Sequence, residues 1–540
     1  MYQHKDDTRL LQRSKVVSAS EAVRYIRSDS TLATGGFIGC GFAEGLAVAL
    51  EDQFLGKNNL PQKGYPSGLT LVYAGGQGDG VDRGLNHLAH QGLLKCVIGG
   101  HWGLAPKLQI LALNNQIEAY NLPQGVISQL FRDIAGHRPG LITKVGLHTF
   151  VDPRLGGGSV NVSSQRKLID LLDIDGEEYL LYKTFPIDFC LLRGTTADTR
   201  GNITMEREAL TLESLAIAMA THNSGGTVVV QVERIAKTGS LSSRQVKIPG
   251  ILVDYVVLCD NPQHHLQTFA EPYSAAFSGE IVAPTIKIPS KKLDTRKIIA
   301  RRAALELHIN DIVNLGVGIP EEIAIISFEE EIVELITLTA EPGVIGGIPA
   351  SGLNFGASIN AQAILDQPYQ FDFYDGGGLD IAFLGMAQVD SKGNIDVSRF
   401  NDHLAGAGGF ISISQNTTRI VFVGTFCAGN QEIQVQQGHL KIIKEGNVKK
   451  FISVVEQITF NGLRAINRNQ EVLYITERGV FKLVKDGIEL IEIAPGIDLA
   501  KDILNLMDFK PLVSASLKLM DKRIFLDEPM QISKTIQSKF

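Results

Sequence analysis

Two short motifs occur twice in this chain, and this internal repeat restricts it to folds built from two similar halves. Residues 39–47 (GCGFAEGLA) match residues 316–324 (GVGIPEEIA), and residues 197–208 (ADTRGNITMERE) match residues 389–400 (VDSKGNIDVSRF). The separation is 277 positions for the first motif and 192 for the second, so the halves carry insertions of different length. A chain of 540 residues is also too long for one hydrophobic core. We therefore predict two homologous units, residues 1–277 and 296–540, joined by a linker at residues 278–295.

Hydrophobic and capping patterns indicate that both units are open α/β domains. An amphipathic helix is expected before each copy of the first motif. Ser18 and Glu21 can form a capping box at the start of one helix, and Asp294 can cap the other. Short Val/Ile runs, such as residues 227–235 and 418–426, alternate with helical patterns. This alternation is typical of helices packed on largely parallel sheets.

Composition and motif content exclude several classes of function. A net charge of −7 gives no general attraction to nucleic acid or to an anionic membrane, and no run of 18 apolar residues could span a bilayer. The five scattered cysteines include no C-x-x-C pair, so neither a zinc site nor a disulfide framework is indicated. The first 15 residues lack the apolar core of a signal peptide. We expect a cytoplasmic protein without a metal, nucleic-acid or membrane partner.

One carboxylate stands at the end of a predicted strand, in the stretch LTAEPGVIGG at residues 338–347. Glu341 follows an apolar run, and Pro342 and Gly343 turn the chain directly after it. An ordinary solvated turn would have the same composition. Matching Ala74 to Ala340 in the repeat, however, places a glycine in the first half where the second half has Glu341. Because ligands bind at strand ends in open α/β sheets, we interpret Glu341 as a candidate reactive group.

Glycine-rich segments supply exposed backbone for a ligand. Residues 34–45 (TGGFIGCGFAEG) are expected to turn into a helix, where backbone amides and the helix dipole can stabilise negative charge. They do not match G-x-G-x-x-G, so no nicotinamide-binding fold is predicted. Residues 74–80, 374–380 and 405–410 are further glycine-rich segments. His101 and Trp102 could line a pocket, although a packed core pair is the preferred interpretation.

Taken together, five segments closely resemble family I coenzyme A transferases. These are GGFIGCGFAE, residues 74–107, NSGGTVVVQVERI, TAEPGVIGG and AGAGGFISIS. The resemblance covers nearly the whole chain and is strongest to single-chain acetate/propionate CoA-transferases, with a more distant similarity to succinyl-CoA:3-oxoacid CoA-transferase. Two departures from the family pattern, Ala340-Glu341-Pro342-Gly343 at the glutamate motif and Ala43 in place of a proline, fit the acetate/propionate group.

The resemblance implies a fold, an activity and a set of site residues. It implies two open α/β domains with the active site between them, and Glu341 as the nucleophile. It implies that Gly39, Cys40 and Gln77 stabilise the oxyanion. It also implies contacts with CoA from the second half, at Gly376, Gly377, Gly378, Gly408, Gly409 and Phe410.

The implied reaction moves CoA between a short-chain acyl-CoA and a free acid such as acetate, propionate, butyrate or acetoacetate. Glutamate has an ordinary pKa of about 4.3, so Glu341 is expected to be ionised and to form a glutamyl-CoA thioester in a ping-pong mechanism. CoA is then a substrate and a covalent intermediate, no cofactor is bound permanently, and the family suggests a homo-oligomer. Two alternatives remain open: an acyl-CoA hydrolase on the same scaffold, and a sensor module that binds a metabolite without turnover.

Overall fold

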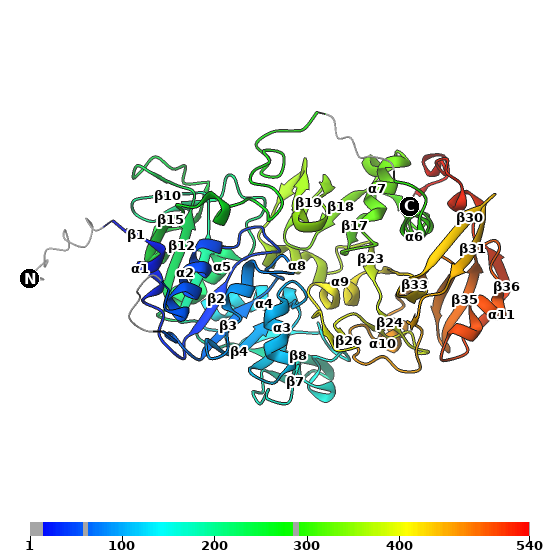
Figure 1. Cartoon of the computed structure of the whole chain (residues 1–540), viewed down its shortest axis with the longest axis horizontal. Coiled ribbons are helices and arrows are strands. Elements are labelled where there is room, and N and C mark those ends of the chain that lie inside the picture. The colour runs from blue at the N-terminus through cyan, green and yellow to red at the C-terminus, as the bar shows by residue number, and fades with distance from the viewer. Residues whose placement is uncertain (1–13, 58–62, 285–290, 539–540) are drawn as a thin grey trace, which may run out of the picture.

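The computed structural model describes residues 14–57, 63–284 and 291–538. The signal-peptide prediction, which concerns the first residues, lies largely outside this described part, as do residues 285–290 of the predicted linker. Within the described part, two large sheets lie side by side along the long axis of the molecule (Figure 1).

The first sheet takes its strands from residues 16–258, and each pair of neighbouring strands in it is parallel. Its central strands are rich in Val, Leu and Ile and are buried, as expected for a parallel sheet that is covered on both faces. In spatial order its described strands are β1 (Val16–Val17), β15 (Tyr255–Leu258), β12 (Thr227–Val232), β9 (Phe189–Arg193), β2 (Thr31–Thr34), β3 (Leu69–Tyr73), β4 (Leu94–Gly99) and β5 (Glu118–Asn121). The helices of this half are α1 (Ala19–Val23), α2 (Glu44–Leu55), α3 (Pro106–Leu113), α4 (Gln124–Ala135) and α5 (Ser214–Asn223).

The second sheet has a parallel centre with antiparallel strand pairs added on both sides. In spatial order its described strands are β22 (Ala363–Ile364), β19 (Val344–Ile345), β18 (Thr337–Ala340), β17 (Ile312–Leu315), β23 (Ile381–Gly385), β28 (Arg419–Val423), β33 (Glu471–Ile475), β34 (Gly479–Val484), β35 (Gly487–Ile493) and β36 (Leu512–Leu519). The helices of this half are α6 (Thr295–Ala304), α7 (Glu322–Glu329), α8 (Gln367–Asp375), α9 (Phe410–Asn416), α10 (Gly462–Asn467) and α11 (Leu499–Asp502).

The sheets repeat the same strand order, which agrees with the predicted internal repeat. Strands β15, β12, β9, β2 and β3 follow one another in the first sheet as β33, β28, β23, β17 and β18 do in the second. We aligned the two sheets by the second repeated motif, whose copies lie 192 positions apart. The pairing of neighbouring strands in each sheet then makes Ala74, not Gly75, the equivalent of Glu341. The predicted match of Ala74 with Ala340 is therefore wrong by one residue, because cross-strand pairing and not local similarity sets the register. The first half still has no reactive side chain at this place.

The predicted helix starts are confirmed. Ser18 and Glu21 form the capping box of α1, and the Asp294 side chain accepts from a backbone amide at the start of α6. The first repeated motif leads into α2 in one half and into α7 in the other, and its last residues belong to the helix in each case. Its second glycine has a left-handed φ in both copies, 67° at Gly41 and 92° at Gly318, which explains why glycine is used there.

The second repeated motif has the same structural role in both halves. The carboxylates of Asp198 and Asp390 each accept from the amides two and four residues later, at 2.9 and 3.0 Å. The asparagine of each motif then accepts from a glycine amide of a distant segment, Gly250 in the first half and Gly462 in the second. The motif thus joins two loops by hydrogen bonds. This structural role explains why the motif occurs in both halves, and it requires no ligand.

The two halves meet through α4 on one side and α8 and α9 on the other (Figure 1). Arg132 of α4 donates two hydrogen bonds to Asp372 of α8, at 2.8 and 2.7 Å. An apolar cluster also combines residues of both halves next to the end of β18: Phe37, Ile38, Cys40, Ala209, Leu210, Leu212, Phe277, Ala340, Val344, Phe355 and Ala357. No helix of the described part has the length and apolar character needed to cross a membrane.

Candidate active site

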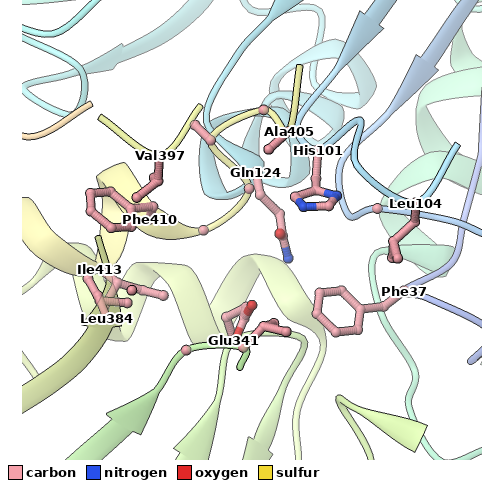
Figure 2. A pocket seen from close by; sticks show the side chains of 18 of the residues that line it. Phe37, His101, Leu104, Gln124, Glu341, Leu384, Val397, Ala405, Phe410 and Ile413 are labelled. Atoms are coloured by element: carbon pink, nitrogen blue, oxygen red, sulfur yellow. The ribbon is translucent and has the colours of Figure 1, made fainter. Parts of the chain in front are cut away.

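Glu341 lies directly after β18, on a tight turn that aims its side chain into a pocket between the halves (Figure 2). The turn is closed by a hydrogen bond from the Gly343 amide to the Ala340 carbonyl oxygen, 3.1 Å long. Gly343 has φ of 127°, and a Cβ there would lie 2.1 Å from the Leu365 carbonyl oxygen. Only glycine fits this position, so the sequence of the turn fixes the direction of the glutamate.

The pocket encloses about 210 Å³ and draws its walls from both halves. Three of its lining side chains are polar, namely Glu341, Gln124 and His101. The other lining residues are glycines or have apolar side chains: Phe37, Ile38, Gly76, Leu104, Gly316, Val317, Leu384, Gly385, Val397, Ala405, Gly406, Ala407, Gly408, Gly409, Phe410 and Ile413. A carboxylate in such surroundings has few neighbours that can stabilise its charge.

The electrostatics of Glu341 differ from the expectation of an ordinary, ionised glutamate. Its side chain is 8% exposed, and its Oε2 atom is buried without a hydrogen-bond partner among the described residues. Burial raises the pKa of Glu341 to about 7, and hydrogen bonds from its own amide and from Asn314 offset this only in part. At neutral pH the carboxylate is therefore present but poorly solvated.

A buried polar network behind Glu341 holds its neighbours in place. Asn314 of β17 donates from Nδ2 to the Tyr374 hydroxyl oxygen at 3.3 Å. The Tyr374 hydroxyl donates to Thr339 Oγ1 at 2.8 Å, and the Thr339 hydroxyl donates to the Val313 carbonyl oxygen at 2.9 Å. Strands β17 and β18 and helix α8 are thereby connected beneath the glutamate, which makes Asn314 a positioning residue for Glu341.

Gln124 is a site residue that the sequence interpretation missed. It is the first residue of α4 and is 1% exposed, and Figure 2 shows its amide group extending across the pocket toward Glu341. Its Nε2 atom donates weakly to Gln367 Oε1 at 3.4 Å, and its backbone amide donates to the Gly408 carbonyl oxygen at 2.9 Å. The Pro-Gln-Gly sequence at 123–125, which starts a helix after a strand, is the local signal that could have indicated it.

Of the predicted pair His101 and Trp102, the tryptophan belongs to the core and the histidine to the pocket wall. Trp102 is fully buried and packs edge-on to Tyr73, as the core interpretation predicts. His101 lines the pocket, where Figure 2 shows its imidazole across the cavity from Glu341 and on the same side as Leu104 and Phe37.

The second-half loop at residues 408–410, for which contact with CoA is predicted, lies in the pocket wall. Gly408, Gly409 and Phe410 all line it, directly before and at the start of α9. A Cβ at Gly409 would lie 3.4 Å from Cγ of Glu341, so this backbone passes close to the reactive side chain.

Gly376, Gly377 and Gly378 do not line the pocket. Gly376 caps the C-terminus of α8, and the three glycines precede β23. Since β23 and β18 run parallel in the same sheet, the loop before β23 lies at the opposite edge from Glu341, which follows β18. These glycines end a helix, and the structure does not bring them to the site.

Gly39, Cys40 and Gln77 lie behind the pocket wall and not in it. The Cys40 amide donates to the Phe37 carbonyl oxygen at 2.9 Å, so this amide already has an acceptor within its own loop. The Gln77 side chain is bonded to Thr34 and to the Gly36 carbonyl oxygen, and thus fastens the loop to β2. The members of this region that do face the cavity are Phe37, Ile38 and Gly76.

Comparison with known proteins gives consistent matches. The family model described as Coenzyme A transferase matches residues 16–258. Caffeate CoA-transferase of Acetobacterium woodii is 48% identical over 95% of this chain and 98% of its own. Acetate CoA-transferase YdiF of Escherichia coli O157:H7 is 45% identical over 97% of each chain. A crystal structure of that acyl-CoA transferase as a thioester complex with CoA matches with a TM-score of 0.90 and 43% identity, over 98% of this chain and 99% of its own.

A more distant relative is succinyl-CoA:3-ketoacid coenzyme A transferase 2B, a mitochondrial protein of Mus musculus, 25% identical over 88% of this chain and 85% of its own. The chain therefore belongs to the coenzyme A transferase family. It is an enzyme that transfers CoA, and the predicted resemblance and α/β fold class are confirmed. Among the residues that the structure describes, no group of His, Cys, Asp and Glu side chains is arranged to hold a metal ion.

Proposed function

We propose that this enzyme moves CoA between short-chain acyl-CoA esters and free carboxylic acids through a thioester formed on Glu341. The observation that carries the proposal is the setting of Glu341. It is the one carboxylate of a small pocket whose walls, apart from Gln124 and His101, are apolar or glycine, and one of its oxygens has no partner among the described residues. Such a carboxylate is held in position by the turn but is weakly stabilised, which suits a nucleophile.

After each step of this reaction an activated acyl group is held as a thioester or as an anhydride, so its free energy is not lost by hydrolysis. A carboxylate oxygen of Glu341 attacks the acyl-CoA carbonyl carbon, and the C–S bond breaks to leave an acyl-glutamyl anhydride and CoA thiolate. The thiolate attacks the Glu341 carbonyl carbon and releases the first acid as a carboxylate. An incoming carboxylate then attacks the glutamyl thioester, and the same steps run in reverse. No outside energy source or proton donor is required.

Gln124 supplies the side-chain amide that can stabilise the oxyanion formed in each addition. Its position across the pocket from Glu341 supports this role (Figure 2). Removing one such donor costs about 2.7–4 kcal/mol of transition-state stabilisation in other enzymes. The proposed CoA path leads past Gly408, Gly409 and Phe410. Since the cavity is smaller than the usual range of roughly 300–1,000 Å³ for ligand pockets, the larger part of CoA must extend out of it.

The test is to incubate the enzyme with acetyl-CoA alone, remove free ligand and digest the protein. A peptide that contains Glu341 and carries the mass of CoA is expected. Initial rates measured against acetyl-CoA at several fixed concentrations of an acceptor acid should give parallel double-reciprocal lines. Intersecting lines without a modified peptide would contradict the covalent route. Release of free CoA without an acceptor acid at the transfer rate would instead support the hydrolase alternative, and binding without turnover would support the sensor alternative.

We also infer that the enzyme is cytoplasmic and forms a homo-oligomer, and that its halves divide at 1–277 and 296–540. The five free cysteines, four of them buried, favour a reducing compartment. The inference of a homo-oligomer rests on the family resemblance, and sedimentation of the purified enzyme tests it.

A further inference from the structure

One polar side chain of the pocket has no task in the proposed steps. Glu341 forms the covalent bond, and Gln124 faces the reacting carbonyl oxygen. His101 is the third polar side chain on the wall, and neither of these tasks requires it.

The imidazole of His101 is fixed by close contact with glycine backbone. A Cβ at Gly76 would lie 2.6 Å from Nδ1 of His101, and one at Gly103 would lie 3.0 Å from its Cε1. A Cβ at Gly408 would lie 3.6 Å from its Cδ2. The ring is therefore packed on three sides by residues without side chains, and it has little room to turn away from the cavity.

The hydrogen-bonding capacity of this ring is unused within the described residues. Nδ1 is buried without a partner, and no hydrogen bond joins Nε2 to another group of the described chain. Since Nδ1 is covered, Nε2 is the polar atom that the ring can offer to the cavity. Burial, together with the nearby His403, lowers the pKa of His101 to about 4, so the ring is neutral at pH 7. A neutral imidazole donates from one nitrogen and accepts at the other.

The neighbours of His101 on the wall are apolar, which decides what kind of acyl group suits it. Phe37 and Leu104 border the same part of the cavity (Figure 2). A plain alkyl chain packed there would cover the imidazole without offering it a hydrogen bond. Burying a polar group in this way is unfavourable, whereas a hydroxyl or oxo oxygen on the chain would satisfy it.

We propose that His101 selects acyl groups whose short chain carries a hydroxyl or oxo oxygen next to the reacting carboxyl or one carbon further. This proposal rests on the proposed function, since it assigns the part of the pocket that contains His101, Phe37 and Leu104 to the acyl chain. It adds a specificity-determining residue to that reaction.

The experiment compares acids that differ by one oxygen, with acetyl-CoA as the donor. The pairs are lactate against propionate, and 3-hydroxybutyrate or acetoacetate against butyrate. In at least one pair the oxygenated acid is expected to have a kcat/KM about tenfold higher or more in the wild type, within the roughly 5–150-fold range that an unmade buried hydrogen bond implies. His101→Phe, which keeps the ring volume but has no polar atom, should bring that ratio close to one. His101→Gln, whose amide reaches the position of Nε2, should recover part of the preference.

Three results would overturn the proposal. One is a wild-type ratio near one in every pair, and the second is a preference that persists in His101→Phe. The third is loss of the preference in His101→Gln to the same extent as in His101→Phe. The mass of CoA on the Glu341 peptide and the thermal unfolding midpoint are measured for each variant, so that a folding defect is not taken for altered selectivity. If no acyl-CoA modifies the wild-type enzyme, the proposed function fails, and the present inference fails with it.

Discussion

At the scale of single residues, the carboxylate that reacts also lowers the stability of the folded chain when it is ionised. Burial raises the pKa of Glu341 to about 7 from a reference of 4.5. A carboxyl whose pKa is higher in the folded chain contributes stability that is fully present below the unfolded pKa and is lost as pH rises through the folded value. Above pH 7, therefore, the folded enzyme contains a carboxylate that would be better solvated in the unfolded chain.

This loss of stability predicts that Glu341→Gln is more stable than the wild type at alkaline pH. At pH 8 the free energy of unfolding should rise by up to about 3 kcal/mol, since each unit of pKa shift corresponds to about 1.4 kcal/mol. At pH 5 the two proteins should differ little, because the wild-type glutamate is then mostly protonated when folded. Urea unfolding at both pH values measures this. Equal stability at pH 8 would mean that the carboxylate is well satisfied in its pocket.

The same pKa predicts the pH dependence of catalysis. The nucleophile must be ionised, so kcat/KM should fall below pH 7 as the carboxylate of the free enzyme takes up a proton. Asn314→Ala removes a hydrogen bond that lowers the pKa of Glu341, and it should therefore move the midpoint of the profile to higher pH. Rate profiles of both proteins check this. A midpoint near pH 4.5, or one that Asn314→Ala leaves in place, would speak against Glu341 as the titrating group.

At the scale of elements, the glycine loop between β2 and α2 has a structural demand that can be tested. A Cβ at Gly39 would lie 2.4 Å from the backbone nitrogen of Phe269. Gly39→Val should therefore destabilise the enzyme by about 1–3 kcal/mol or more and reduce turnover as the loop shifts. Cys40→Ser is the control in the same loop. Burial raises the pKa of the Cys40 thiol to about 12, so this thiol is not a nucleophile at neutral pH, and the folded variant should remain active. Loss of all activity in well-folded Cys40→Ser would contradict this.

The elements also show which parts of the site a sequence can predict. The capping residues of α1 and α6 and the turn after β18 depend on neighbours within a few residues, so local patterns were sufficient to predict them. Gln124 and His101 face Glu341 only because the fold brings distant strands and helices together. The Pro-Gln-Gly sequence marks the helix start at Gln124, but no local pattern shows that these two side chains share a pocket with Glu341. Gly376–Gly378 illustrate the opposite error. Their composition suggests a ligand loop, but the direction of β23 places them at the far edge of the sheet.

At the scale of the whole molecule, the site depends on how closely the two halves approach. The pocket walls come from both halves, and α4 carries Gln124 directly beside the contact with α8 and α9. Gly125 lets α4 approach the second half closely, since a Cβ there would lie 2.5 Å from Phe371 of α8 and 2.7 Å from Ser412 of α9. The Arg132–Asp372 pair is half exposed and contributes little by comparison. We therefore expect the packing at Gly125 to influence the distance between Gln124 and Glu341.

This geometry predicts that adding a single methyl group at Gly125 separates the halves and impairs catalysis. Within a helix, alanine is normally more favourable than glycine by about 0.5–1 kcal/mol, so any loss of stability in Gly125→Ala must come from the clash. A shift of about 1 Å between catalytic groups can cost roughly 10²-fold in rate, and we expect a fall in kcat/KM of that order. Gly136→Ala, at the other end of α4, is the matched control, because its Cβ would have only ordinary contacts at 3.4 Å and beyond. Unfolding and steady-state kinetics of both variants provide the comparison. If Gly125→Ala keeps wild-type kinetics and is as stable as Gly136→Ala, close packing of α4 against the second half does not control the site.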